Sequence, residues 1–166
     1  HHRAQLPGHQ HVEFYDIMER GGFDVIVGNP PYVEYNVVSQ FYALPHAGYD
    51  TEVCGNLYAF FIERARCLCS PAGRIGMIVP VSSVCTERYD PLQSLLRHSG
   101  LCAVANFNDR PSRLFEGIEH CRQSIVLWSL GEKQPRTYST GYTKWRAEER
   151  PLLFSMLSFI DTTDAN

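Results

Sequence analysis

Short apolar runs alternate with amphipathic stretches along most of the chain. The runs at residues 23–27, 74–80 and 101–107 are rich in apolar and β-branched residues, as the buried strands of a parallel sheet are. Between these runs, apolar residues recur at helical spacing over residues 56–69 and over a second segment that ends before Gly100. This order of strands and helices favours an α/β sheet with right-handed crossovers.

The two predicted helices have recognisable boundaries. Asn56 suits the N-cap of the first helix, and Pro71 and Gly73 stop it. The second helix begins near Thr86 or at Asp90, where a proline follows. The residues that we expect to be buried are Tyr58, Phe61, Ile62, Ala65, Leu68 and Cys69 in the first helix, and Leu92, Leu95 and Leu96 in the second.

The last part of the chain predicts one more apolar strand and then a polar segment. Residues 121–130 predict a fourth strand that pairs antiparallel with the run at 101–107, and Arg110–Phe115 predicts a short turn or helix. We therefore expect the second half of a doubly wound sheet, ending in an antiparallel hairpin. The expected division is a connector at 1–22, a folded unit at 23–131 and a linker at 132–166.

Composition and charge discriminate only weakly between classes of protein. The 166 residues are 44% hydrophobic and 20% charged, which is typical of one globular domain, and no apolar run is long enough to cross a bilayer. Residues 1–52 hold seven acidic and two basic side chains, whereas residues 110–150 hold eight basic and five acidic ones. A modestly basic half suits contact with phosphates, but scattered surface charge explains it equally.

The six cysteines include no C-x-x-C pair, and several lie inside apolar runs. Reduced and mostly buried thiols of a cytoplasmic protein are therefore the expectation, with no metal bound. A zinc site that uses His120 and Cys121 is the alternative, although the spacing of further ligands is wrong for it.

The stretch FDVIVGNPPY, residues 23–32, runs a strand directly into an unusual turn. In open α/β sheets ligands bind outside the carboxyl ends of the strands, which is where this turn falls. Pro30 and Pro31 fix the backbone, so that the side-chain oxygen of Asn29 and the carbonyl of Pro30 can be aimed at one point. Two acceptors aimed at one point suit a donor with two hydrogens, such as an exocyclic NH2 group, and Tyr32 offers a flat face to a planar base.

This arrangement would overcome the low reactivity of an aromatic amine. An aromatic amine is a poor nucleophile because its lone pair is delocalised into the ring. Hydrogen bonds accepted from both N–H groups favour a more pyramidal nitrogen, whose lone pair is then directed at an electrophile. A rigid turn with a helix-capping Asn29 is the structural alternative, which the buried apolar strand in front of the turn makes less favoured.

Longer stretches of the chain resemble a known family. GGFDVIVGNPPYVEY is similar to motif IV of the amino-directed, S-adenosylmethionine-dependent methyltransferases, specifically of the group that methylates adenine N6 in DNA. NLYAFFIERARCLCSPAGRIGMIVP and YTKWRAEERPLLF resemble later regions of the methylase part of large single-chain restriction–modification enzymes, up to about residue 150. The resemblance implies a Rossmann-like methyltransferase fold, S-adenosyl-L-methionine as cofactor, and double-stranded DNA as partner.

The resemblance also implies roles for single residues. Asn29, Pro30, Pro31 and Tyr32 would form the catalytic motif: Asn29 and the Pro30 carbonyl would bind the target amino group, and Tyr32 would stack on the adenine. Phe115 matches a second aromatic residue that clamps the base. A place in a small satellite core is the alternative for Phe115.

Cofactor contacts are implied for four residues. Leu57 and Phe61 match positions that contact the adenine of the cofactor, and Asn29 and Pro31 would approach its methionine end. For Phe61, burial in the core is an equal alternative. The glycine-rich loop that holds the methionine moiety is missing, since no G-x-G occurs in the chain.

We therefore expect a fragment with half a cofactor pocket. Its partners would be the rest of a parent polypeptide, which supplies the glycine-rich half and a target-recognition domain. The isolated chain is expected to bind S-adenosylmethionine poorly and not to methylate DNA.

Two other readings of the motif stay open. Release-factor glutamine methyltransferases and certain rRNA guanine methyltransferases share the Asn-Pro-Pro-Tyr motif. Against them, the strand that ends in GMIVPVSS has no terminal acid of the glutamine-methylating type, and the connection at residues 33–55 is long. A catalytically inactive domain that only binds DNA or partner subunits is the non-enzymatic alternative.

Overall fold

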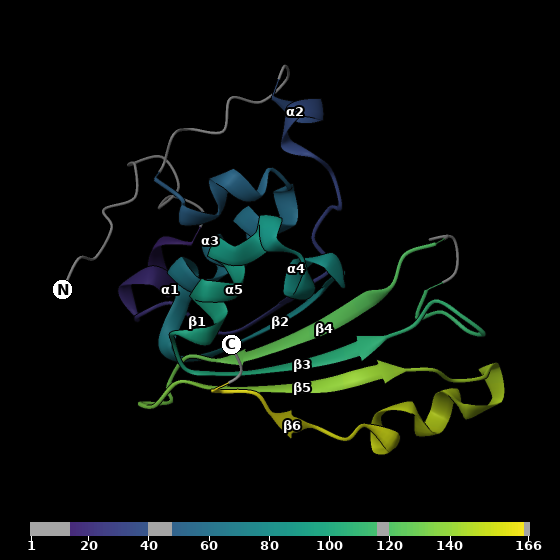
Figure 1. Cartoon of the computed structure of the whole chain (residues 1–166). Coiled ribbons are helices and arrows are strands. Elements are labelled where there is room, and N and C mark those ends of the chain that lie inside the picture. Colours follow the sequence, from purple (N-terminus) through teal and green to yellow (C-terminus); the bar gives the residue numbers. More distant parts are fainter. Residues whose placement is uncertain (1–13, 40–47, 116–119, 165–166) are drawn as a thin grey trace.

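A six-stranded mixed sheet forms the centre of the protein, a computed structural model in which residues 14–39, 48–115 and 120–164 are described (Figure 1). The strand order is β1-β2-β4-β3-β5-β6. The strands are β1 (Phe23–Gly28), β2 (Cys69–Pro80), β3 (Leu101–Phe107), β4 (Gln123–Ser129), β5 (Arg136–Thr143) and β6 (Ile160–Asp161).

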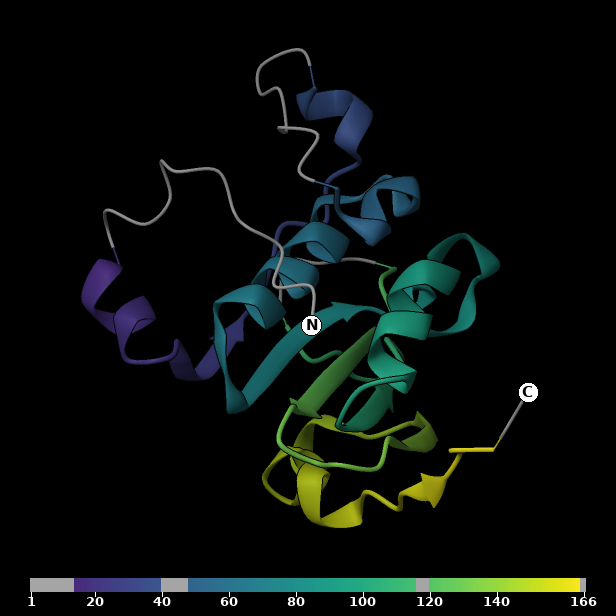
Figure 2. The same ribbon diagram turned by 90° about the vertical axis from the view of Figure 1, so that its left-hand side faces the viewer.

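The helices lie on both sides of this sheet. They are α1 (Tyr15–Glu19), α2 (Tyr35–Val38), α3 (Leu57–Leu68), α4 (Ser82–Cys85) and α5 (Asp90–Arg97), with 3-10 helices η1 (Asp50–Cys54), η2 (Glu87–Tyr89) and η3 (Ala147–Met156). Figures 1 and 2 show α3, α4 and α5 over one face of the sheet, whereas η3 lies toward the opposite face. The mixed α/β fold agrees with the sequence-based expectation.

The strand pairing confirms the predicted hairpin and adds a neighbour to it. β1 pairs parallel with β2, and β3 pairs antiparallel with β4, with Leu101 opposite Ser129 and Phe107 opposite Gln123. β4 also pairs antiparallel with β2, so it lies between β2 and β3. β1, β2 and β3 therefore run in the same direction, and their carboxyl ends meet at one edge of the sheet.

The main core fills the space between the sheet and the helices α3 and α5. Ile62 of α3, Leu92 of α5 and Trp128 of β4 are each at most 1% exposed within it. The predicted burial of Phe61 is wrong, because Phe61 is 49% exposed and the neighbouring Phe60 is buried instead. Phe60 is buried because two tyrosines from the long 33–55 connection, Tyr35 and Tyr49, pack edge-on against its ring.

A second, smaller core lies on the opposite face of the sheet. Ala105 and Phe107 of β3 pack there with Trp145 and with Leu153 of η3, and all four side chains are buried. Trp145 and Leu153 belong to the polar segment after residue 131, in which no strand was predicted. In the structure, β5 lies in that segment and pairs parallel with β3. The expected division of the chain at residue 131 stays a prediction.

Several local expectations need correction. Residues 81–84, expected as a loop, include the start of α4. Residues 110–115, for which a short turn or helix was expected, contain bends and no helix, so only the helix option is excluded. β1 is an edge strand, and its Val25 and Val27 are 57% and 76% exposed, so the strand is not buried on both faces. Only three of the six free cysteines are buried, because Cys67 and Cys85 are exposed and Cys121 is half-buried.

Candidate functional site

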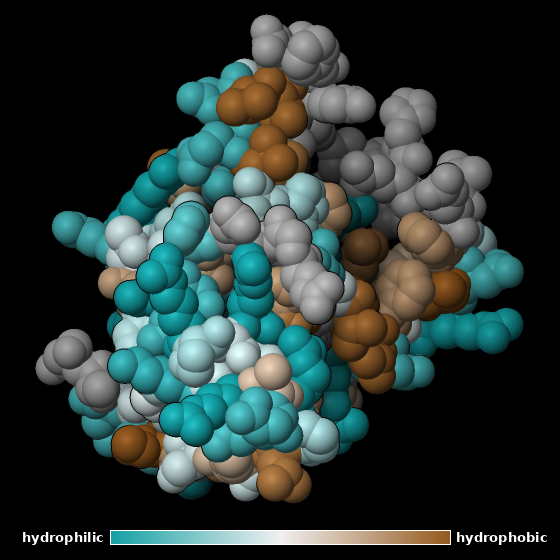
Figure 3. Space-filling model, turned by 90° about the vertical axis from the view of Figure 1, so that its right-hand side faces the viewer, coloured by the Kyte–Doolittle hydropathy of each residue, from teal (hydrophilic) through white to brown (hydrophobic). Residues whose placement is uncertain are grey.

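The Asn-Pro-Pro-Tyr turn leaves the sheet at the carboxyl ends of the parallel strands. Gly28, the last residue of β1, is in register with Met77 of β2, so the turn begins beside the end of β2. Asn29 and Pro31 are exposed and Pro30 is buried. Figure 3 looks onto this edge of the molecule, where polar and apolar surfaces lie side by side.

Tyr32 is fixed at this edge by contacts at both ends of its side chain. Its hydroxyl donates a hydrogen bond to the carbonyl of Ile78 at 3.0 Å and accepts one from the Gln123 amide at 3.4 Å. Its ring meets the ring of Tyr58 edge-on, with centroids 6.1 Å apart. Partial burial raises the pKa of Tyr32 above its usual range, so the phenol stays neutral. Tyr32 also packs against the main core, and its stacking role stays a prediction.

Asn29 lies at the surface and is not turned into the core. The convergence of the Asn29 oxygen and the Pro30 carbonyl on one point stays a prediction.

The segment after the turn is bound to the start of α3. Glu34 and Asn56 form an antiparallel bridge, in which Tyr35 N–H donates to the Gly55 carbonyl at 2.8 Å and Leu57 N–H donates to the Val33 carbonyl at 2.9 Å. Asn56, predicted as an N-cap, makes no side-chain capping bond; its amide donates to Glu34 Oε1 at 3.2 Å.

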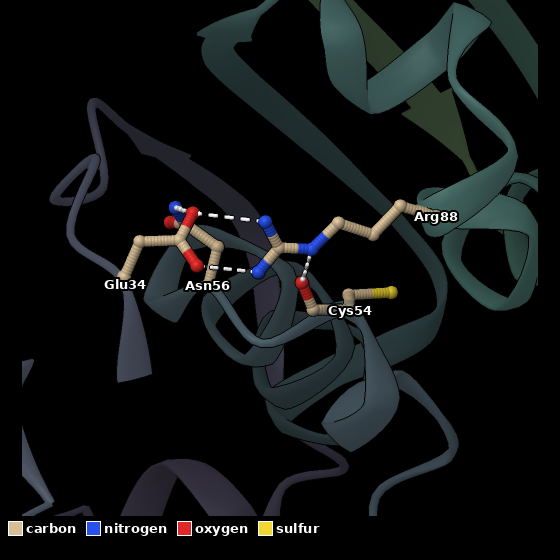
Figure 4. Close-up of polar contacts among 4 residues, drawn as sticks. All are labelled: Glu34, Cys54, Asn56 and Arg88. Carbon is tan, nitrogen blue, oxygen red and sulfur yellow. Dashed lines mark hydrogen bonds and ion pairs between the residues drawn. The ribbon is translucent and has the colours of Figure 1, made fainter. Parts of the chain in front are cut away.

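Arg88, from η2, joins this bridge (Figure 4). Its guanidinium group forms a two-pronged ion pair with Glu34, and its Nε donates to the carbonyl of Cys54 at 2.8 Å. Sequence reasoning missed both Glu34 and Arg88. The two residues are 54 positions apart, and no sequence pattern connects them.

The two residues predicted to contact the cofactor adenine lie on α3. Leu57 is half-buried at the first position of the helix, and Phe61 follows one turn later with its ring 49% exposed. Residues at this spacing share a helix face. Because Phe61 is this exposed, the core alternative for it is excluded. The cofactor role of both residues stays a prediction.

Phe115 lies apart from both cores. It is 37% exposed, and Leu114, not Phe115, packs against the second core. Arg150 holds the chain just before Phe115, since its guanidinium group donates to the carbonyls of Arg113 and Leu114 at 3.0 to 3.3 Å and stacks 4.9 Å from the centre of the Trp145 ring. The residues that follow Phe115, 116–119, lie outside the described part, and the role of Phe115 stays a prediction.

A cavity of about 250 Å³ lies elsewhere, between α5 and the strands β3 and β5, and none of the predicted site residues lines it. Among residues 14–39, 48–115 and 120–164, no group of three or more His, Cys, Asp or Glu side chains is arranged to hold a metal ion, so the His120–Cys121 alternative gains no support. Within the same residues no helix is long and apolar enough to span a membrane.

Sequence and structure comparisons agree on the kind of protein that this chain resembles. Residues 3–115 match the Eco57I restriction-modification methylase family. No curated protein sequence matches the chain significantly.

Three solved structures illustrate the structural likeness. The chain is similar to the Type ISP restriction-modification enzyme LlaGI, solved as a nuclease-deletion mutant with a DNA substrate mimic (TM-score 0.69, 14% identity, 90% of this chain and 18% of that one). It is also similar to DrdV in a DNA complex (0.66, 13%, 93% and 19%). The third is a type I restriction-modification methyltransferase subunit from Streptococcus thermophilus (0.52, 16%, 74% and 26%). The chain thus spans 18% to 26% of the length of these proteins, and the likeness concerns the fold.

Proposed function

The chain belongs to the Eco57I restriction-modification methylase family, and we propose that it is the catalytic half of a site-specific DNA methyltransferase. The proposed reaction transfers a methyl group from S-adenosyl-L-methionine to N6 of adenine in duplex DNA. One observation carries the proposal: an exposed Asn29 and a fixed, half-buried Tyr32 follow a parallel strand at the carboxyl edge of the sheet.

The proposed chemistry is a direct transfer. The target adenine leaves the duplex, which costs a few kcal/mol, and stacking on Tyr32 and Phe115 offsets this by about 1–3 kcal/mol for each ring. Asn29 and the Pro30 carbonyl would accept hydrogen bonds from the two N–H groups of the exocyclic amine, so that its lone pair is directed at the methyl donor. As the amine takes up the methyl group, the donor's C–S bond would break, a neutral thioether would leave, and the amine would lose one proton. The cofactor supplies the electrophilic methyl group, and Leu57, Phe61, Asn29 and Pro31 would hold it. Positioning of the two reactants then provides most of the catalysis.

The exposed face of the sheet supports the proposal that further polypeptide completes this unit. Val27, Gly76 and Leu127 are in register across β1, β2 and β4 and flank one another on that face. Val27 and Leu127 are 76% and 51% exposed, and β1 is the edge strand beside them among the strands described. Open edges and contiguous apolar surface are typical of places where another segment packs. We propose that this segment is the glycine-rich cofactor half of a parent polypeptide.

Two comparisons support DNA as the partner, because the LlaGI structure holds a DNA substrate mimic and the DrdV structure is a DNA complex. The cofactor and the adenine specificity rest on the motif and its placement. A glutamine side chain or an rRNA guanine as acceptor, and an inactive DNA-binding role, are treated as outcomes of the test below.

The test uses the longer polypeptide that contains this chain. Labelled methyl transfer from S-adenosyl-L-methionine is measured with adenine-containing duplex DNA, a release factor and rRNA as acceptors. We expect transfer to DNA alone, its loss in Asn29→Ala, and its retention in the matched control Asn36→Ala, which changes another exposed asparagine on α2. Transfer to either other acceptor, or binding of DNA without transfer, would favour the alternatives. The isolated chain should show no transfer to DNA.

A further inference from the structure

We propose that Arg88 and Glu34 form a clasp that positions the Asn29–Tyr32 turn relative to α3. Both are positioning residues in this proposal, since neither is expected to touch a substrate. The proposal rests on the proposed function, because the turn would hold the base and α3 would hold the cofactor. The clasp would therefore set the distance between the two reactants.

The clasp joins three separate segments at one guanidinium group. Arg88 contacts both carboxylate oxygens of Glu34, two residues after Tyr32, and its Nη1 lies 3.2 Å from Glu34 Oε1. The same group donates to the Cys54 carbonyl at 2.8 Å, at the end of η1. The Asn56 amide donates to Glu34 from the other side at 3.2 Å, and α3 begins at the next residue (Figure 4).

A second route connects Arg88 to the turn through aromatic rings. The guanidinium carbon lies 5.7 Å from the centre of the Tyr89 ring. The Tyr89 ring stacks on Tyr58 of α3 at 5.4 Å, and Tyr58 meets Tyr32 edge-on at 6.1 Å. A displacement of Arg88 therefore reaches Tyr32 both through the Glu34 carboxylate and through two packed rings.

The geometry favours a positioning role over a role in stability. The side chains of Arg88 and Glu34 are 45% and 44% exposed, and ion pairs at that exposure contribute little to the free energy of unfolding. A planar guanidinium group that binds a carboxylate with two prongs nevertheless fixes direction as well as distance. Small misplacements of reacting groups can slow a reaction by about 100-fold, so a weak clasp can still matter for rate.

The first part of the test measures methyl transfer to duplex DNA under single-turnover conditions, using the longer polypeptide. Arg88→Ala and Glu34→Ala are expected to slow transfer by roughly 10- to 100-fold while binding of DNA changes less than threefold. Arg97→Ala, an exposed arginine on α5, is the matched control and should leave the rate unchanged. Arg88→Lys keeps the charge but loses the two-pronged contact, and it should restore only part of the rate.

The second part uses this chain alone and does not depend on activity. Amide hydrogen exchange is measured at Tyr35 and Leu57, whose N–H groups close the bridge beneath the clasp. We expect faster exchange at both amides in Arg88→Ala with an unchanged urea midpoint of unfolding. Unchanged exchange, or a fall in the midpoint that accounts for the faster exchange, would overturn the clasp. If the longer wild-type polypeptide transfers no methyl group to DNA, the proposed function fails, and the exchange experiment alone decides whether the clasp holds the turn.

Discussion

Substitution of Trp145 by alanine tests whether the C-terminal segment is part of the same folded unit as the sheet. Trp145 follows β5 and is 1% exposed, in the second core with Phe107 and Leu153. Its indole lies under the Arg150 guanidinium group, with 4.9 Å between the guanidinium carbon and the ring centre. The indole N–H is buried without a hydrogen-bond partner among the described residues.

These contacts set the expected magnitude. Removal of a buried tryptophan side chain costs about 3–5 kcal/mol through lost burial and the cavity that remains. Loss of the stacked arginine adds about 0.5–1 kcal/mol. Removal of the unpartnered N–H gives back about 1–3 kcal/mol, because that group no longer has to be desolvated. Burial outweighs the N–H term, so we expect Trp145→Ala to lower the free energy of unfolding by about 3 kcal/mol.

The chain offers a built-in reporter for this experiment. It has two tryptophans, and Trp128 lies in the main core, 1% exposed, with its N–H donated to the Ser99 carbonyl at 2.5 Å. In Trp145→Ala the fluorescence of Trp128 therefore reports on the main core alone. With a typical urea dependence of about 2 kcal/mol per molar, the midpoint should fall by about 1.5 M.

Trp145→Phe is the matched control. It keeps a buried ring and removes the unpartnered N–H, so it should lower the free energy of unfolding by about 1 kcal/mol. An unchanged Trp128 midpoint in Trp145→Ala would mean that the C-terminal segment unfolds independently, and the reasoning would be refuted.

Three further predictions concern the surroundings of the sheet and the turn. Gly100 has φ +71°, and a Cβ there would lie 2.1 Å from a β4 carbonyl oxygen. Gly100→Ala should therefore lower the free energy of unfolding, measured by urea titration, by at least about 2 kcal/mol, and a loss below about 0.5 kcal/mol would contradict this. The buried Glu63 carboxylate accepts hydrogen bonds from the Thr51 N–H at 3.0 Å and hydroxyl at 2.7 Å, so Glu63→Ala should cost about 3 kcal/mol. Glu63→Gln, which keeps an acceptor oxygen, should cost clearly less; equal costs would contradict this and show that the negative charge is required. Hydrogen bonding to Arg88 lowers the pKa of Glu34, so the clasp should persist below the ordinary carboxyl range and open only as pH falls through the lowered pKa; an NMR titration that finds the same pKa in Arg88→Ala would contradict this.

The parts of the fold that depend on local pattern were predictable. β1 and β3 begin at the predicted residues because their apolar runs are bounded by glycine and polar residues. β4 lies within the predicted strand, and its predicted antiparallel pairing with β3 is confirmed.

The parts that depend on tertiary contacts were not predictable. β5 is rich in polar residues and buries only Thr140, so its sequence pattern does not indicate a strand. Its strand conformation depends on parallel pairing with β3. The choice of Phe60 over Phe61 as the buried residue depends on tyrosines from a distant connection.

The candidate site, too, was predictable where it depends on local sequence and not where it depends on tertiary contacts. The position of the Asn29–Tyr32 turn at the end of β1 follows from the sequence, because a strand runs directly into it. Its support by Ile78, Gln123 and the Arg88 clasp does not, since these contacts join residues 46, 91 and 54 positions apart. Such pairs are created by the packing of the whole fold.

The central claim concerns where the amine of the target base is held. A structure of the longer polypeptide bound to duplex DNA would measure the separation between the Asn29 side-chain oxygen and the exocyclic nitrogen of the target adenine. We predict a flipped adenine with that separation at hydrogen-bond length, about 3 Å, and with its face against Tyr32. A flipped base whose amino group is held by other residues, with the Asn29 amide turned away from it, would contradict the account.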